Sequence, residues 1–205
     1  MLTIWGRKNS TNVRKALWAA EEVGVPYTRH DAGGAFGVVN EPHYRAMNPN
    51  GLVPVIEDDG LVLWESNAIV RYLAAKYADG VLYAKDPGER AQADKWMDWT
   101  TSLAAPFRDV FWGTLRTPPE QRNAQVIAAG IQRCSELLAM PEKALSEQPY
   151  LSGATFGMGD IPLGCAIYAW FEMPIERPDQ PNLLAWYERL KERPAFQAAV
   201  MTALT

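Results

Sequence analysis

Cysteine and histidine are scarce in this 205-residue chain, which contains two of each. Cys134 and Cys165 lie far apart inside helical patterns, and no CxxC pair occurs. The sequence therefore gives little support for a dithiol redox site or for a metal site, whose ligands are mostly Cys and His. We expect no metal, and we expect both cysteines to be buried as small apolar side chains in a reducing compartment.

Long apolar runs and an excess of positive charge are also lacking. No run of 18 apolar residues occurs, so the sequence predicts no membrane-spanning helix. The strand-like segment Leu2–Trp5 begins at once and leaves no room for a signal peptide, so we expect a cytoplasmic protein. The net charge of −4 and the pI near 5.3 argue against a nucleic-acid-binding surface.

Strand-like and helical patterns alternate up to about residue 78. Val13, Leu17 and Trp18 recur on one side of a predicted helix over 12–23, and Gly24 is placed to end it. The other predicted elements are strands at 2–5, 27–30, 53–57 and 61–64 and helices at 42–47 and 66–77. The order β-α-β-α-β-β-α predicts a mixed sheet with helices on its faces, which is the thioredoxin-like arrangement.

Strand signals vanish from about residue 86 onward. A long helix is expected through Trp96 and Val110, bent or broken near Pro106. Further helices are predicted near 127–138, 160–171, 182–191 and 195–204. The segment 77–88 is thus the predicted linker between an α/β domain at 1–78 and an all-α domain at 88–205.

The most informative segment is 51–73, which predicts strand, turn, strand and helix. The Val53-Pro54 step places a proline at the start of a strand, where a missing N–H is tolerated and a cis bond costs little. A cis bond there would turn the N–H and C=O of Val53 outward, toward an extended peptide-like ligand. Ser66 opens a helix whose free N–H groups suit a carboxylate, and Glu65 offers a negative group for an ammonium. Together these features describe a pocket for the γ-glutamyl-cysteinyl portion of glutathione.

The order and spacing of these residues resemble one family. Asn48-Pro-Asn-Gly-Leu-Val-Pro54, followed by Leu63-Trp-Glu-Ser-Asn-Ala-Ile69, closely resembles the cytosolic glutathione transferase superfamily. The resemblance implies an N-terminal thioredoxin-like domain, a C-terminal all-helical domain, glutathione as co-substrate, a role in detoxification and a homodimer. In that dimer the helix at 66–77 packs against the first long helix of the other subunit, and Arg71 and Asp94 are charges that would pair across the interface.

A second segment carries the expected chemistry. Ser10-Thr-Asn-Val-Arg-Lys15 resembles the Ser-x-Asn-Val segment of serine-type transferases of the phi and theta-like classes. The resemblance places Ser10 as hydrogen-bond donor to the glutathione thiolate, with Asn12 as the alternative. A hydroxyl and a helix N-terminus aimed at sulfur would favour the thiolate, since a free thiol has a pKa of about 8.5. Ser10, Thr11 or Asn12 is also expected to cap the helix. The nearby basic residues would either favour the thiolate or lie as solvated surface: Arg7, Lys8, Arg14 and Lys15.

Three positions depart from the family pattern. The stretch Phe36-Gly-Val-Val-Asn40 has no cation where the phi class carries a His-Lys pair for the glycine carboxylate, which argues against that class. Leu52 stands where many relatives carry Gln or Lys. Gly157-Met-Gly-Asp160 replaces a Ser/Thr-x-x-Asp capping box, although Asp160 is still expected to accept from a backbone N–H.

The hydrophobic electrophile is expected on the face of the α-domain opposite Ser10. A stripe of mostly aromatic residues at helical spacing is the candidate lining: Trp99, Leu103, Phe107, Phe111 and Trp112. Such a stripe is also typical of core residues.

Two other functions fit the same resemblance. One is a different glutathione-dependent enzyme on this fold, either an isomerase of the maleylacetoacetate type or a disulfide reductase. The other is a non-catalytic module that binds hydrophobic ligands or protein partners, because fold alone does not settle function.

Overall fold

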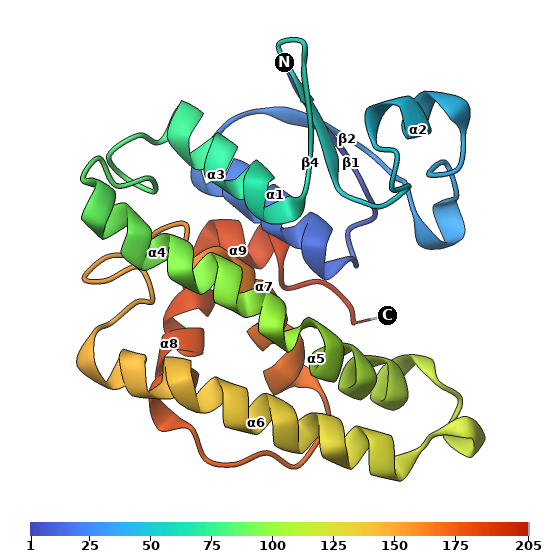
Figure 1. The fold of residues 1–205 in the computed structure, drawn as a ribbon, viewed down its shortest axis with the longest axis vertical. Helices are drawn as coiled ribbons and strands as arrows, with labels where there is room; N and C mark the ends of the chain where they lie inside the picture. The colour runs from blue at the N-terminus through green and yellow to red at the C-terminus, as the bar shows by residue number, and fades with distance from the viewer. Residues whose placement is uncertain (205) are drawn as a thin grey trace.

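The chain forms an α/β part followed by an all-helical part, and a computed structural model describes residues 1–204 (Figure 1). The elements of the α/β part are β1 (Leu2–Trp5), α1 (Thr11–Glu22), β2 (Tyr27–His30), the short 3₁₀ helix η1 (Gly34–Phe36), α2 (Pro42–Met47), β3 (Val55–Asp58), β4 (Leu61–Trp64) and α3 (Ser66–Tyr77). The expected element order and the thioredoxin-like arrangement are confirmed.

The four strands lie in the order β2-β1-β3-β4, with β1 parallel to β2 and antiparallel to β3, and β3 antiparallel to β4. Successive residues of a strand face opposite sides. Ile56 accordingly enters the main core with α1 and α3, while Val55 packs in a smaller cluster with Tyr44 of α2. The sheet thus carries α1 and α3 on one face and α2 on the other.

Helix α1 connects the two parts of the chain, and its C-terminus is closed by Gly24. The N–H of Gly24 donates to the carbonyl of Glu21, and the N–H of Val25 donates to that of Ala20, while Gly24 has a φ of 65°. This is the Schellman arrangement, which favours glycine because the backbone is left-handed there. The expected end of the helix at Gly24 is confirmed.

The helical part begins at Pro87. Its elements are α4 (Pro87–Trp99), the 3₁₀ helix η2 (Thr100–Leu103), α5 (Ala104–Phe111), the π-helix η3 (Trp112–Arg116), the 3₁₀ helix η4 (Pro119–Gln121), α6 (Ala124–Glu147), α7 (Asp160–Glu172), α8 (Pro181–Lys191) and α9 (Pro194–Ala199). Because strands and α3 end by Tyr77, we propose domain bounds at 1–78 and 88–205. None of the helices within residues 1–204 is both long and apolar enough to cross a membrane.

The long helix is interrupted at Thr100–Leu103, before Pro106. Pro106 lies in the first turn of α5, where backbone N–H groups have no intrahelical acceptor and a proline removes nothing. The expected break is therefore present, but the chain makes it one turn earlier than the proline.

Helix α7 packs tightly against α1 at the boundary between the two parts. A Cβ at Gly164 would lie 2.6 Å from the Trp18 ring, so only a glycine allows this approach. Asp160, at the start of α7, accepts from the N–H groups of Leu151 and Gly157 at 2.8 and 3.1 Å. It also accepts from the Trp186 indole at 2.9 Å. The expected backbone contact of Asp160 is confirmed, and it is one bond of a larger buried network.

Arg71 of α3 corrects one expectation. Its guanidinium lies 2.6 Å from Asp94 and 2.6 Å from Asp98, both on α4 of the same chain. The expected pair across a dimer interface is therefore an intrachain pair, because α3 and α4 lie side by side (Figure 1).

Candidate functional site

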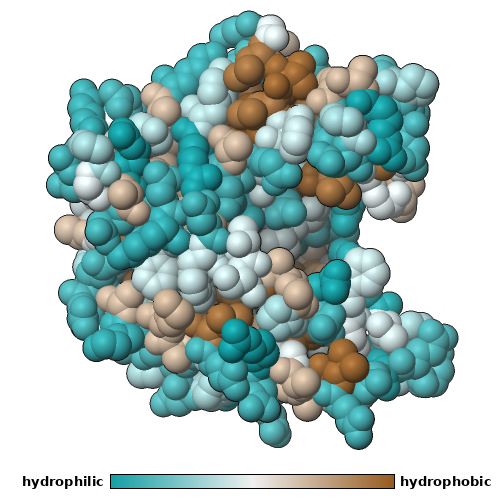
Figure 2. Space-filling view, in the orientation of Figure 1, coloured by the Kyte–Doolittle hydropathy of each residue, from teal (hydrophilic) through white to brown (hydrophobic). Residues whose placement is uncertain are grey.

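Two adjoining cavities lie beside the first turn of α1. The smaller, about 210 Å³, is here named the Ser10 cleft and is lined by Arg7, Asn9, Ser10, Thr11, Asn12, Phe107, Arg108, Phe111, Trp112 and Arg116. The larger, about 550 Å³, is named the Ser66 pocket. Its lining includes Thr11, Asn12, Lys15, Glu65, Ser66, Asn67, Leu103 and Phe107. Thr11, Asn12 and Phe107 line both cavities. Figure 2 shows the surface hollowed on the right, between the α/β part above and α5 below.

A third and larger hollow, of about 830 Å³, lies elsewhere. It is bounded by the segment that joins α3 to α4 and by the loop before α7, and none of the predicted site residues lines it. Ser10, Asn12, Glu65 and Ser66 therefore gather at the first two cavities, whereas Val53 and Pro54 line neither.

The hydroxyl of Ser10 is not hydrogen-bonded to the backbone of α1. It occupies the N-cap position of α1 with an extended backbone, and its carbonyl accepts from the N–H of Arg14. Its side chain makes no capping hydrogen bond, and within residues 1–204 the hydroxyl has no hydrogen-bond partner. A serine at an N-cap normally satisfies a free N–H group. Here Ser10 holds the N-cap position without making that bond, and it lines the Ser10 cleft.

Asn12 belongs to the Ser66 pocket through its side chain. The Ser66 hydroxyl donates to Asn12 Oδ1 across 3.4 Å, and Lys15 Nζ donates to Ser66 Oγ at 3.4 Å and to Asn67 Oδ1 at 3.2 Å. These contacts join the first turns of α1 and α3. Of the two candidate residues, only Asn12 contacts Ser66.

The start of α3 presents both signs of charge. Glu65 has a φ of 73°, a conformation that costs non-glycine residues about 1–3 kcal/mol and clusters at functional sites. Its carboxylate is exposed and has no hydrogen-bond or ion-pair partner among residues 1–204. The N–H groups of Ser66, Asn67 and Ala68 likewise have no acceptor in the described chain, because the intrahelical ladder starts at Ile69.

The Val53-Pro54 bond is cis, as expected. Within residues 1–204, neither the N–H nor the C=O of Val53 takes part in a hydrogen bond. A methyl group at Gly33 would lie 3.2 Å from a Val53 methyl and 3.4 Å from the Arg7 guanidinium. The end of β1, the loop after β2 and Val53 therefore converge, and Arg7 brings a cation to that junction.

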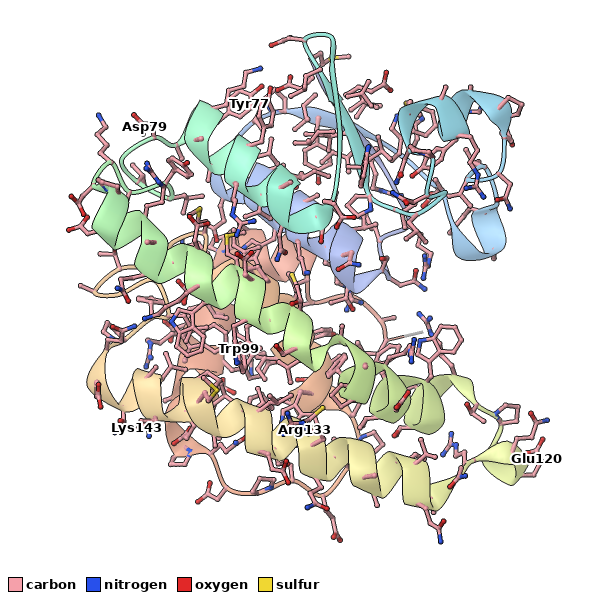
Figure 3. All side chains as sticks on the ribbon, viewed as in Figure 1. Tyr77, Asp79, Trp99, Glu120, Arg133 and Lys143 are labelled. Carbon is pink, nitrogen blue, oxygen red and sulfur yellow. The ribbon has the colours of Figure 1, made fainter. Side chains whose placement is uncertain are left out.

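The predicted aromatic lining is brought to the site only in part. Phe107, Phe111 and Trp112 line the Ser10 cleft, whereas Leu103 lines the Ser66 pocket. Trp99 lines neither cavity: it packs edge to face on Trp96, with ring centroids 5.4 Å apart, on the inner side of α4 (Figure 3). Helical spacing alone does not separate these two environments.

Two basic residues at the site are buried, contrary to the view of them as solvated surface. Arg14 is 1% exposed and Lys15 is 8% exposed. Burial lowers the pKa of each below its usual value. Arg14 Nη2 lies 2.7 Å from Thr202 Oγ1 and 3.2 Å from the carbonyl of Ala203, so it holds the C-terminal segment beside α1.

Sequence reasoning missed three contributors to the cavities. Arg108 and Arg116 line the Ser10 cleft, and the Arg116 guanidinium lies 5.1 Å from the Phe111 ring and 5.2 Å from the Trp112 ring. Asn67 holds Lys15 in the Ser66 pocket. Each of the three had a signal in the sequence: Asn67 lies in the motif with Glu65 and Ser66, Arg108 directly follows Phe107, and Arg116 lies one helical turn after Trp112.

Comparison with known proteins matches both halves of the chain. Residues 9–76 match the family model of the glutathione S-transferase N-terminal domain, and residues 103–194 match that of the C-terminal domain. Glutathione S-transferase GstB of Escherichia coli strain K12 is 46% identical, over 98% of this chain and 98% of its own length.

Solved structures extend the likeness to three dimensions. The theta class glutathione S-transferase from the citrus canker pathogen Xanthomonas axonopodis pv. citri, with glutathione bound, is 64% identical. It matches with a TM-score of 0.97 over 100% of this chain and 99% of that chain. Its apo form matches with a TM-score of 0.88 at 58% identity, over 100% and 98%. Since the likeness covers nearly the full length of these relatives, the chain belongs to the glutathione S-transferase family.

Proposed function

We propose that this protein conjugates the thiol of glutathione to hydrophobic electrophiles, with Ser10 stabilising the thiolate. The observation that carries the proposal is the Ser10 hydroxyl, which makes no capping bond although it occupies the N-cap of α1. Ser10 lines a cleft that shares Thr11, Asn12 and Phe107 with the Ser66 pocket. A hydroxyl donor and a helix N-terminus at one sulfur are the groups that lower a thiol pKa.

Glutathione fits the two cavities in one direction. Its γ-glutamyl group has both charges matched at the start of α3, where Glu65 faces the ammonium and the free N–H groups face the carboxylate. The unpaired N–H and C=O of Val53 suit the cysteinyl backbone. In the proposed orientation the sulfur lies toward Ser10 and the glycine end toward Arg7, which would supply the cation that Phe36–Asn40 and Leu52 lack.

The reaction follows from that placement. The thiol proton leaves to solvent, and the Ser10 O–H donates to the resulting thiolate. The sulfur lone pair forms a carbon–sulfur bond to the electrophile, whose leaving group departs with the electron pair of the broken bond. Phe107, Phe111 and Trp112 provide apolar contact for the electrophile. Two findings support this function: the family membership, and the 64% identical relative whose structure holds glutathione.

The test measures thiolate formation and conjugation separately. Binding of glutathione to the wild type should produce thiolate absorbance near neutral pH, and a chloro-nitroaromatic electrophile should be conjugated. Ser10→Ala should bind glutathione with little change but lose about 100- to 1000-fold in kcat, the usual effect of removing one such donor. Ser146→Ala, on the outer surface of α6, is the matched control. No retention on glutathione-agarose and no thiolate absorbance would contradict the proposal.

The same measurements distinguish the other functions. Retention on glutathione without conjugation would favour an isomerase or a disulfide reductase. Binding of hydrophobic ligands without glutathione retention would favour a non-catalytic module.

Three wider features belong to the same proposal. The family resemblance supports a homodimer that uses α3 and α4, a cytoplasmic location and a role in detoxification. Light scattering after size-exclusion chromatography tests the dimer, and a monomer at micromolar concentration would contradict it.

A further inference from the structure

Lys15 is a buried cation that has no carboxylate beside it. It is 8% exposed, and within residues 1–204 it forms no ion pair. Its ammonium contacts only two neutral oxygens, Asn67 Oδ1 at 3.2 Å and Ser66 Oγ at 3.4 Å. An ammonium can donate three hydrogen bonds, so one remains. Burying such a charge without a counter-ion is strongly unfavourable.

The groups around Lys15 do not provide that counter-ion. Cys165 of α7 faces it, but burial raises the pKa of this thiol to about 12, so it is neutral at physiological pH. Glu65 acts on Lys15 only through space, as an exposed carboxylate with no ion pair to it. Arg14 is the preceding residue of α1 and adds further positive charge.

Lys15 lines the Ser66 pocket together with the start of α3. The free N–H groups of Ser66, Asn67 and Ala68 lie at the positive end of the helix dipole, which favours an anion. A buried ammonium next to a helix N-terminus therefore concentrates positive potential at one wall of the pocket. Glu65 supplies the opposite sign at its rim.

Resting on the proposed binding of glutathione, we propose that Lys15 binds the α-carboxylate of the γ-glutamyl group, so that its counter-ion arrives with the ligand. Lys15 thereby makes the pocket selective for a γ-glutamyl group over a peptide that lacks the carboxylate. The alternative is a purely architectural role, in which Lys15 ties α1 to α3 through Ser66 and Asn67.

A cycle of protein and ligand changes separates these roles. The ligands are glutathione and 4-aminobutyryl-cysteinyl-glycine, which differs only in lacking the α-carboxylate. The variants are Lys15→Met, of similar length without charge, and Lys15→Gln, which keeps a donor for Ser66 or Asn67. Lys15→Arg retains the charge. Calorimetry gives each Kd, and thermal unfolding without ligand gives each Tm.

For the proposed role, Lys15→Met and Lys15→Gln weaken glutathione binding about 30-fold or more, as expected for loss of one partner of a buried charge pair. They leave the Kd of the decarboxylated ligand unchanged, and Lys15→Arg retains more glutathione affinity than either. The Tm of Lys15→Met without ligand is unchanged or higher, because an unpaired buried charge has been replaced by an apolar side chain.

Two outcomes overturn the role of Lys15 alone: equal weakening of both ligands by Lys15→Met and Lys15→Gln, or wild-type protein that binds both ligands equally well. Failure of the wild type to bind either ligand would instead contradict the proposed function itself. If Lys15→Met does not fold, the same comparison in Lys15→Gln decides, and if neither folds the architectural role is established and the proposal is wrong.

Discussion

The hydroxyl of Ser66 donates to the side-chain oxygen of Asn12 across 3.4 Å, which joins the first turn of α3 to that of α1. This distance is at the long end for a hydrogen bond between side chains. A ligand carboxylate that approaches Ser66 would offer its hydroxyl a shorter, charge-assisted bond. We therefore expect Asn12 to affect the binding of glutathione, whereas Ser10 lines the cleft where the sulfur is expected.

Asn12→Ala is predicted to raise KM for glutathione about fivefold, the equivalent of one ordinary hydrogen bond, with the pKa of bound thiol unchanged. Ser10→Ala is predicted to leave KM for glutathione nearly unchanged and to raise the pKa of the bound thiol. Steady-state kinetics with a thiolate titration in each variant measure both effects. Loss of thiolate in Asn12→Ala with normal thiolate in Ser10→Ala would exchange the two roles.

Arg7→Gln is predicted to weaken glutathione about tenfold by removing a charge-assisted contact to the glycine carboxylate. The ligand control is glutathione ethyl ester, in which that carboxylate is neutral. The variant should bind the ester as well as the wild type does. Equal weakening of both ligands would assign Arg7 to the thiolate instead, since Arg7 also lines the Ser10 cleft.

Arg14→Met is predicted to release the C-terminal segment. The variant removes the guanidinium that donates to the carbonyls of Thr202 and Ala203, and loss of a hydrogen bond from a charged group costs about 1.5–3 kcal/mol. Hydrogen exchange should accelerate in residues 200–203, while the exposed Arg133→Met on α6 should leave it unchanged. Unaltered exchange in Arg14→Met would mean that Tyr168, which donates to the Thr202 carbonyl at 2.9 Å, holds the segment by itself.

Asp160→Ala is predicted to lower the free energy of unfolding by about 3–5 kcal/mol, because the buried N–H donors of Leu151, Gly157 and Trp186 lose their acceptor. Chemical denaturation measures the loss. Asp179→Ala, at an exposed position, should change stability by less than about 0.5 kcal/mol. Similar values for the two variants would rule out a structural role for the network.

Stability is predicted to fall in acid through Asp58. Burial alone would raise the pKa of this carboxyl, but hydrogen bonds from Lys76, Tyr77 and Tyr72 hold the pKa below its usual value. A depressed pKa stabilises the fold above the unfolded-state value, and this stabilisation is lost as pH falls through the native value. The free energy of unfolding measured by denaturation should therefore fall below about pH 4. In Asp58→Asn it should fall less steeply over the same pH range. An identical slope in the variant would contradict the assignment.

Local signals predicted the α/β part closely. The strands at Leu2–Trp5, Tyr27–His30 and Leu61–Trp64 and the helix at Ser66–Tyr77 were predicted with the observed ends. Each of these elements is bounded by a glycine, a proline or a capping residue. Such residues start or end an element through local backbone preferences, which can be read from the sequence. The break at Thr100–Leu103 was predicted too far along the chain, near Pro106. A proline in the first turn of a helix removes no intrahelical hydrogen bond and so does not break the helix.

The residues of the site were predictable where a motif fixes backbone geometry, as at Val53-Pro54 and Glu65-Ser66. The burial of Arg14 and Lys15 was not. Two consecutive basic residues in a short loop-to-helix segment predict a solvated surface, and the partner of Arg14 lies 188 residues later in the chain. The core position of Trp99 was equally unpredictable. Helical periodicity shows which residues share a face of the helix, but not whether that face packs on another helix or lines a cavity.

The close approach of α7 to α1 at Gly164 and Trp18 has a consequence for cooperativity. Helix α1 carries residues of the site at its first turn and core contacts with the helical part along its length. The α/β part and the helical part should therefore melt in one transition rather than two. A ligand held at the end of α1 would then raise the melting temperature of helices that it never touches.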